Sequence, residues 1–155
     1  MQHRMKTHQL SEPEIETLFL EARVGRLATL NADGFPYITP VHFVYHGGRI
    51  YIHGLIKGQK IDNIRNDPRV CFEIDRMDHL IPHELPCEVN TAYQSIIAFG
   101  TASVVENTEK KIEILNEVVG KYMPALAGKP FPENMLAGTG VIEVVLARVT
   151  GKYYR

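Results

Sequence analysis

The segment HGLIKGQKIDNIRNDP (residues 53–68) combines residue types that bind anions. It follows a strand-like RIYI and places Lys57, Gly58 and Lys60 at the start of a short helical pattern. The first backbone N–H groups of a helix have no partner within the helix and attract negative charge. Glycine lets the backbone approach a ligand, and lysines add charge-assisted hydrogen bonds to phosphate oxygens. Arg26, on an earlier strand, could converge on the same place. A solvated basic turn would contain the same residues, and the residues alone favour that interpretation.

Two common phosphate-binding motifs are absent from the sequence. No predicted strand is followed by G-x-G-x-x-G, and no G-x-x-x-x-G-K-[ST] occurs. A Rossmann dinucleotide site and a P-loop therefore have no support. Any phosphate-bearing ligand must be held in another way.

Two histidines lie on neighbouring predicted strands. Alternation from Thr39 places Val41 and Phe43 on one face of their strand and His42 on the other. His53 ends the next strand, beside the glycine-rich turn. An imidazole at that position could donate a proton to a bound substrate. An ordinary hydrogen-bonded strand histidine is the other interpretation, and the residues alone favour it.

A third group, His79, His83 and Cys87, repeats at intervals of four. On a helix this spacing would place three metal ligands on one face. Pro82 and Pro86 interrupt the segment, however, so a helix is not expected there. We therefore predict no metal site, and a metal protein built on these residues is the least favoured class.

Helices and strands must position these side chains. Ser11 with Glu14 forms a capping box, and apolar residues at helical spacing extend a core-covering helix to about Ala22. KIDNIRN predicts a short helix stopped by Asp-Pro. Thr108 is predicted to cap a third helix, which ends near Pro124.

Six strands are predicted. The first three should form an antiparallel meander, with a tight turn at Gly34. Pro40 lacks an N–H, so its strand must be bulged or at an edge there. Gly100 should mark a bend or bulge. Residues 76–86 and 126–134 are predicted as loops. The strands are expected at residues 24–31, 37–45, 49–54, 69–75, 93–107 and 141–155.

The predicted fold class is mainly β, with peripheral helices. Six antiparallel strands joined by many turns close into a barrel or pack as a sandwich, and we favour a barrel with helices over its openings. The 155 residues, with no internal repeat or linker, predict a single domain spanning residues 1–155.

Composition excludes several classes of protein. A formal net charge of -1 offers no basic field for nucleic acid. Cys71 and Cys87 are too few for a secreted disulfide scaffold, so a reducing cytoplasm is expected. Residues 1–10 contain no apolar run of signal-peptide length, and no segment approaches the ~18 apolar residues of a membrane span.

Several segments together resemble the pyridoxamine 5′-phosphate oxidase-like flavin proteins, and within them the nitroimidazole-resistance (Nim-type) branch. No single motif is decisive, but the ordered set is specific, and it covers most of residues 24–107 and the C-terminal strand. The segments are VGRLATLNADGFPYITPVHFVY, GRIYIHGLIKGQKIDNIRNDPRVCFEID, PCEVNTAYQSIIAFGTASVVEN and the closing VTGK.

This resemblance implies a six-stranded split β-barrel, an FMN cofactor and an obligate homodimer with two flavin sites at its interface. It assigns His53 to the substrate side of the flavin. It also implies that the partner subunit brings residues 93–95 to the site. The implied cofactor-binding residues are Arg26, Leu27, Ala28, Thr29, Thr39, Pro40, Val41, His42, His53, Gly54, Lys57, Gly58, Gln59, Lys60, Tyr93, Gln94 and Ser95.

One departure from the family pattern concerns the phosphate. The wider oxidase family often has serine, arginine and lysine at this turn, whereas here Gly58 and Gln59 precede Lys60. The resemblance therefore implies that the phosphate is held with less charge.

For function, the resemblance implies an FMN-dependent oxidoreductase acting on a small molecule, for example the reduction of nitro compounds such as nitroimidazoles. The alternative is a dimer that holds flavin, haem or the deazaflavin F420 without fast turnover. Pyridoxamine-phosphate oxidation is the less favoured enzymatic activity.

Overall fold

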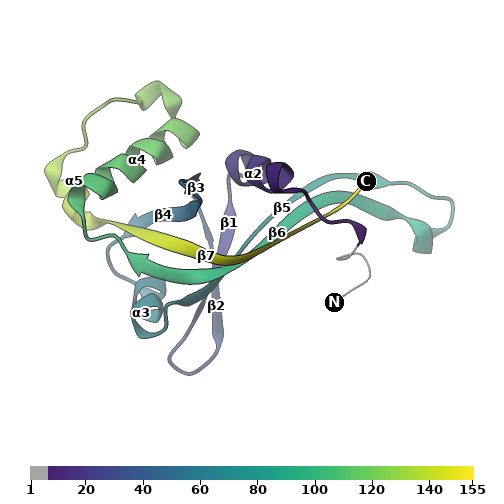
Figure 1. Cartoon of the computed structure of the whole chain (residues 1–155), viewed down its shortest axis with the longest axis horizontal. Helices are drawn as coiled ribbons and strands as arrows, with labels where there is room; N and C mark the ends of the chain where they lie inside the picture. Colours follow the sequence, from purple (N-terminus) through teal and green to yellow (C-terminus); the bar gives the residue numbers. More distant parts are fainter. Residues whose placement is uncertain (1–6) are drawn as a thin grey trace.

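The computed structural model describes residues 7–155, which form one antiparallel sheet covered by helices (Figure 1). The expectation about a signal peptide therefore falls in part outside the described residues. The sheet order is β2-β1-β5-β6-β7-β4-β3. The strands are β1 (Gly25–Leu30), β2 (Pro36–Val41), β3 (Phe43–His46), β4 (Arg49–Leu55), β5 (Arg69–Ile81), β6 (Asn90–Val104) and β7 (Thr139–Tyr154). The helices are α2 (Glu12–Glu21), α3 (Gln59–Asn66), α4 (Thr108–Tyr122) and α5 (Glu133–Gly138), with 3-10 turns η1 (Pro86–Glu88) and η2 (Pro124–Leu126).

The sheet closes into a barrel because β2 and β3 lie at its opposite edges although only His42 separates them in sequence. β2 pairs with β1 as far as Val41, and β3 pairs with β4 from Phe43 onward. The chain therefore changes partners at one residue, and the sheet must curl until its two edges meet there.

The prediction of a mainly β fold with peripheral helices is confirmed, with seven strands instead of six. The predicted strand 37–45 is two strands, β2 and β3. Both antiparallel hairpins of the predicted meander are present, but they lie at opposite edges of the sheet, so the three predicted strands are not adjacent in it. Pro40 lies on an edge strand, as predicted, where its missing N–H interrupts no ladder.

The barrel interior is filled by alternate residues of the strands. Phe43 and Phe72 pack edge to face with ring centroids 4.9 Å apart, and both are fully buried. Helix α2 covers one opening with Leu18 and Phe19. Its predicted capping box is present, because the Ser11 N–H donates to the Glu14 carboxylate at 2.8 Å.

A second hydrophobic layer lies outside the barrel, where α4 packs against β3, β4 and β7 (Figure 1). Apolar residues of α4 meet Val44, Tyr51 and Val141 of the strands. The helix begins as predicted, but its cap is Asn107 rather than Thr108: the Asn107 side chain accepts the Lys110 N–H at 2.7 Å. Helix α5 was not predicted, since six residues are too few to show a helical period; only its first two residues fall in the predicted loop 126–134.

The loop predicted at residues 76–86 is wrong as far as Ile81 and confirmed for residues 82–85. Strand β5 continues to Ile81 and pairs with β6 from Asn90, so that the two strands form a long hairpin reaching out from the barrel (Figure 1). Most side chains from Asp75 to Leu80 are exposed, so the segment lacks the alternation that marks a half-buried strand.

The predicted irregularity at Gly100 is confirmed, because the register between β6 and β7 shifts between Phe99 and Gly100. A Cβ atom at Gly100 would lie 2.2 Å from the Val145 carbonyl oxygen. The backbones approach so closely that only glycine fits.

We predict that Gly100→Ala lowers the free energy of unfolding by about 1–3 kcal/mol, because the new methyl group meets rigid backbone. Gly120→Ala, inside α4 with nothing within 4 Å of the new Cβ, should instead raise it by about 0.5–1 kcal/mol. Urea unfolding of both variants checks the prediction. A Gly100→Ala variant as stable as the wild type would contradict the close approach of the two backbones at Gly100.

Candidate functional site

The segment from Gly54 to Lys60 forms an open corner between β4 and α3. Gly58 caps α3 with φ 127°, a conformation that favours glycine. The N–H groups of Ile61 and Asp62 both donate to the Gly58 carbonyl. Among the described residues, the N–H groups of Gln59 and Lys60 have no partner. The first turn of α3 therefore presents free donors to an anion.

Lys60 bends back toward the end of β4. Its Nζ would lie 3.6 Å from a Cβ built on Gly54, and its charge helps to lower the pKa of His53. Lys57, by contrast, is exposed on the loop before the helix. One lysine is thus placed at the corner, while the other remains in solvent.

A polar network fixes α3 to the barrel. Asn63 is only 3% exposed, and its Nδ2 donates to Thr29 Oγ1 at 2.9 Å and to Asn31 Oδ1 at 2.8 Å. Gln59 Nε2 donates to Asn63 Oδ1 at 2.8 Å. The network orients the first turn of α3, and it gives Thr29 and Gln59 structural partners inside the chain.

His53 lies beside this corner, partly buried beneath α4 and α5. Burial lowers the pKa of its imidazole, and the charges of His42 and Lys60 lower it further. Its Nδ1 is buried and makes no hydrogen bond within residues 7–155. The two histidine rings are roughly stacked, with centroids 6.4 Å apart. These surroundings favour a neutral imidazole at His53.

An apolar cavity of about 230 Å³ opens on the α4 side of His53. Helices α4 and α5 and the loop between them supply most of its wall. The Thr139 hydroxyl, at its edge, donates to the Met135 carbonyl at 2.8 Å. The lining residues are His53, Leu115, Val118, Val119, Phe131, Met135, Leu136 and Thr139.

The C-terminal end of α4 is fastened to the strands. The Tyr122 hydroxyl accepts the Phe43 N–H at 2.9 Å and donates to the Arg23 carbonyl at 2.7 Å. The neighbouring Lys121 ammonium lies 4.0 Å from the centre of the Phe43 ring, and burial, aided by the charge of Arg23, lowers its pKa to about 8. The Tyr122 ring also stacks on His42 at 4.5 Å.

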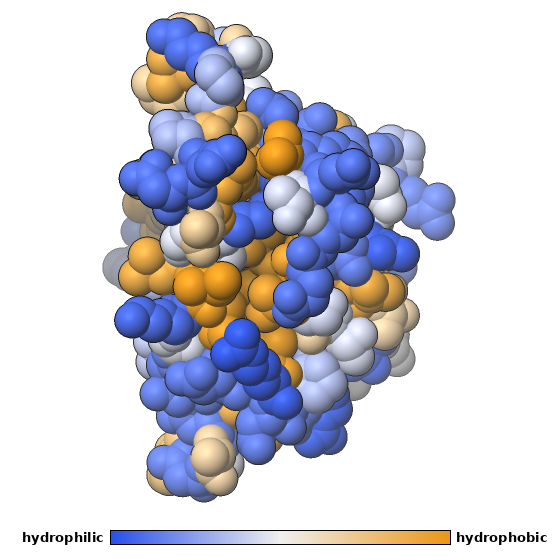
Figure 2. Space-filling model, turned by 90° about the vertical axis from the view of Figure 1, so that its left-hand side faces the viewer, coloured by the Kyte–Doolittle hydropathy of each residue, from blue (hydrophilic) through white to orange (hydrophobic). Residues whose placement is uncertain are grey.

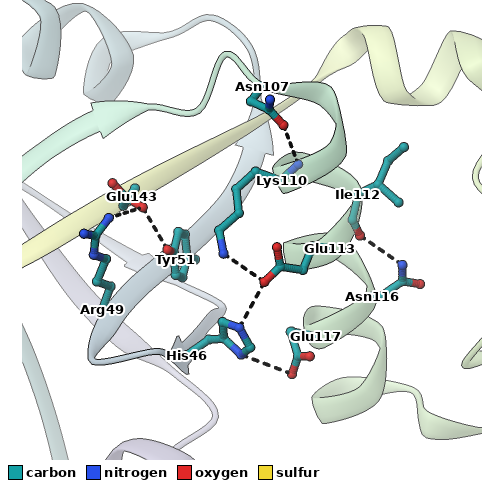
Figure 3. Close-up of polar contacts among 10 residues, drawn as sticks. All are labelled: His46, Arg49, Tyr51, Asn107, Lys110, Ile112, Glu113, Asn116, Glu117 and Glu143. Atoms are coloured by element: carbon teal, nitrogen blue, oxygen red, sulfur yellow. Dashed lines mark hydrogen bonds and ion pairs between the residues drawn. The ribbon is translucent and has the colours of Figure 1, made fainter.

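Figure 3 shows a second attachment, nearer the start of α4. Glu113 accepts from Lys110 at 2.8 Å and lies 3.1 Å from His46 Nε2 at the end of β3. Across the sheet, the Tyr51 hydroxyl donates to Glu143 at 2.8 Å. The contact of Glu113 with His46, together with Tyr122, holds α4 over the His53 cavity.

Arg26 is not brought to the corner. It forms ion pairs with Glu73 at 2.9 Å and Asp75 at 2.5 Å. It also lies three residues along β1 from Thr29, which is roughly 10 Å at the usual rise of a strand. Any positive charge at the corner comes from the lysines.

Other predicted residues divide between the two faces of the barrel wall. Leu27 and Val41 belong to the core, whereas Ala28 and Pro40 point outward. Thr39 lies opposite Leu27, and its Oγ1 is buried without a hydrogen bond in the described part of the chain.

Tyr93, Gln94 and Ser95 lie at the base of the β5–β6 hairpin, paired with Met77, Arg76 and Asp75. Gln94 is buried and accepts from Arg76 at 3.1 Å. The structure does not join these residues to the corner of their own chain. Their contribution from a partner subunit stays a prediction.

His79, His83 and Cys87 do not form a ligand cluster. His83 Nδ1 accepts the Leu85 N–H at 3.1 Å, and no three His, Cys, Asp or Glu side chains between residues 7 and 155 lie close enough to share a metal ion. No helix in the same residues is both long and apolar enough to cross a membrane.

Sequence reasoning missed Asn31, Asn63 and Tyr122. Asn63 stands in a polar helix, KIDNIRN, where nothing local distinguishes a buried amide from an exposed one. Tyr122 stands at helical spacing among apolar residues of α4, and its hydroxyl contacts Phe43 and Arg23, which lie 79 and 99 positions away in sequence. The cavity lining was missed because α5 was not predicted.

The described residues fit a flavin phosphate and ring. Free N–H groups and Lys60 suit a phosphate, and two buried polar atoms, Thr39 Oγ1 and His53 Nδ1, lack partners within the described chain. Because an unsatisfied buried polar atom costs about 1–3 kcal/mol, such atoms commonly mark ligand sites.

Comparison with known proteins shows the family of the chain. Residues 11–153 match the model of the pyridoxamine 5′-phosphate oxidase family, so the chain belongs to that family. One curated relative, an uncharacterized protein of Rhizobium meliloti, is 34% identical over 65 residues. The match spans 42% of this chain and 42% of the relative.

Solved structures show the same fold, a flavin-binding split barrel. The flavocytochrome Anf3 from Azotobacter vinelandii has a TM-score of 0.88 and 18% identity, covering 100% of this chain and 72% of its own. An FAD and haem binding protein from Mycobacterium smegmatis has a TM-score of 0.87 and 18% identity, with coverage of 96% and 74%. A putative 5-nitroimidazole antibiotic resistance protein from Bacteroides thetaiotaomicron has a TM-score of 0.79 and 21% identity, with coverage of 94% and 86%.

We predict that Asn63→Ala lowers the free energy of unfolding by about 1–3 kcal/mol, because Thr29 and Gln59 lose their buried partner. Asn66→Ala, at the exposed end of the same helix, should change it by less than about 0.5 kcal/mol. Thermal and urea unfolding measure both. Equal stability of the two variants would show that the network does not fix α3.

Proposed function

We propose that the chain binds FMN and uses it as an oxidoreductase acting on a small molecule. The observation that carries this proposal is the open first turn of α3, with Lys60 beside His53 at the end of β4. A phosphate at that turn would place the attached ring along the strand ends, toward the histidine. Membership of the pyridoxamine 5′-phosphate oxidase family supports the same cofactor class.

Each part of the site has a distinct task in this proposal. The N–H groups of Gln59 and Lys60 and the Lys60 ammonium bind the phosphate, as helix N-termini and lysines do. Thr39 Oγ1 and neighbouring β2 backbone orient the ring. Bound flavin supplies electron transfer, while the protein supplies orientation and excludes water.

His53 stands on the substrate side. Its pKa is lowered, chiefly by burial, so the imidazole is neutral near pH 7 and can hold or pass a proton without presenting a charge. Reduction of a nitro compound suits such a residue: two electrons from an external donor such as NAD(P)H and two protons convert the nitro group to a nitroso group and water. Similarity to the putative nitroimidazole resistance protein supports this substrate class.

The alternative is a cofactor-holding protein without fast turnover. His53 with an unpartnered Nδ1 next to an apolar cavity also suits an axial ligand of haem. The fold shared with a flavocytochrome and with an FAD and haem binding protein supports this second candidate.

We further propose a homodimer. Ile38, Ala28, Cys71 and Phe99 are paired in register across four strands and form an apolar row on the outer face of the barrel. Ile38 is 61% exposed and Phe99 is 39% exposed. Exposed apolar rows of this kind mark protein interfaces. Phe99, at one end of the row, lies on β6, the strand that also carries Tyr93, Gln94 and Ser95.

The first experiment is the visible absorption spectrum after incubation with FMN and desalting. The wild type should retain about one flavin per subunit. Lys60→Met should weaken FMN binding about tenfold to a hundredfold, since it removes one charge-assisted hydrogen bond. Lys129→Met, exposed on the loop before α5, is the matched control and should bind as the wild type does.

Equal retention in both lysine variants would mean that the corner does not hold the phosphate. Adding NAD(P)H and then a nitroaromatic to the loaded protein separates the two candidates. Bleaching followed by reoxidation supports the oxidoreductase. Retained flavin that is never reduced, or haem uptake instead, supports the holding protein.

For the dimer, Ile38→Glu should convert the wild-type molar mass to that of a single chain in light scattering, because a charge would be buried in the interface. Leu20→Glu changes an equally exposed apolar residue on α2 and should leave the mass unchanged. A monomeric wild type would overturn the proposal.

A further inference from the structure

We infer that the cavity between α4, α5 and His53 is a specificity pocket that binds an uncharged aromatic group. The inference deepens the proposed function, on which it rests for calling the occupant part of a substrate. Binding of such a group is a property of this chain's own residues, however, and can be measured whether or not flavin is present.

The size and lining of the cavity carry the argument. Its volume is about 230 Å³, and six of its eight lining residues are apolar. An engineered apolar cavity of about 150 Å³ in another protein stays dry and binds benzene. This cavity is larger and open to solvent at its rim, so it has room for a ring of one or two cycles and a path by which the ring can enter.

The chemistry of the wall favours an aromatic occupant over an aliphatic one. Phe131 offers a ring face or edge, and Met135 offers a polarisable thioether, both of which attract aromatic rings. Met135 is 61% exposed at the rim, so its flexible side chain can close over an occupant.

The entrance continues this apolar character. Leu55, paired with Thr139, is 71% exposed, and the adjacent Ile56 is 44% exposed. Figure 2 shows the end of the molecule where α5 and the β4–α3 loop lie: hydrophobic residues line a hollow band between hydrophilic margins. Such a hollow selects against charge before a ligand reaches His53.

Charged groups are absent from the cavity wall among the described residues. His53 is its one titratable side chain, and the Thr139 hydroxyl already has a partner. Lys60 lies by Gly54, the residue after His53; its charge acts on His53 from the side of the corner, and its side chain is not part of the pocket wall. A carboxylate or ammonium inside the pocket would lose its hydration without gaining an ion pair.

The test uses three probes of related shape: indole, the anion indole-3-carboxylate and the cation tryptamine. Each is titrated into the full chain, both as purified and after FMN loading, and followed by calorimetry and by the NMR signal of the Met135 methyl group. Indole should bind saturably and shift that signal. Both charged probes should bind at least about tenfold more weakly.

A variant that fills the cavity locates the binding. Val119→Phe should abolish indole binding, while Val89→Phe, on the distant hairpin, should leave it unchanged. Thermal unfolding of both variants verifies folding. If Val119→Phe is unstable, Met135→Glu at the exposed rim replaces it and should reduce indole binding by tenfold or more.

Three results would overturn the inference: no saturable indole binding, undiminished binding to the filled or charged variants, or charged probes that bind as tightly as indole. Flavin retention is measured separately on the same samples. Indole binding by a chain that retains no flavin would therefore refute the proposed cofactor but support the pocket. Flavin retention by a chain that binds no indole would support the cofactor but refute the pocket.

Discussion

The change of strand partner at His42 is the constraint on which the structure depends. Val41 ends the pairing with β1 and Phe43 begins the pairing with β4, so a single residue joins the two edges of the sheet. Both flanking side chains are buried in the barrel, which leaves His42 outside. At this junction the Phe43 N–H has no strand partner and donates to the Tyr122 hydroxyl of α4. Barrel closure and the position of α4 are therefore coupled through the Tyr122 hydroxyl.

That coupling produces a site with two unlike sides. Because α4 is held at Tyr122 and again through Glu113, its apolar face lies over His53. Gly54, the next residue of β4, faces Lys60 instead. Alternation along one strand end thus separates a polar, donor-rich corner from an apolar cavity by a single residue. A ligand with an anionic end and an uncharged ring could satisfy both sides at once.

Local patterns in the sequence predicted the helices and strands well, but they did not predict which distant strands pair. The Ser11–Glu14 capping box and the irregularity at Gly100 follow from the chemistry of those residues and were found. The partner change at His42 was not, because a nine-residue run of alternating residues looks continuous until its neighbours are known. The hairpin beyond Asp75 was missed since neither of its faces is buried. Asn63 was missed because Thr29 and Asn31, which accept from its amide, lie more than 30 residues away in sequence. His53 was singled out by family resemblance, and its burial under α5 could only come from the structure.

The balance of charge at the corner indicates how it discriminates among ligands. Arg26 is neutralised by Glu73 and Asp75, and the turn residues Gly58 and Gln59 carry no charge. The remaining attraction comes from backbone N–H dipoles and one nearby lysine, which act over a short range and depend on geometry. His53 adds no charge, since burial keeps it neutral. Recognition at this site therefore rests more on shape and on directed hydrogen bonds than on net charge, and the rigidity that the Asn63 network and the Tyr122 bridge give to α3 and α4 becomes part of the binding energy.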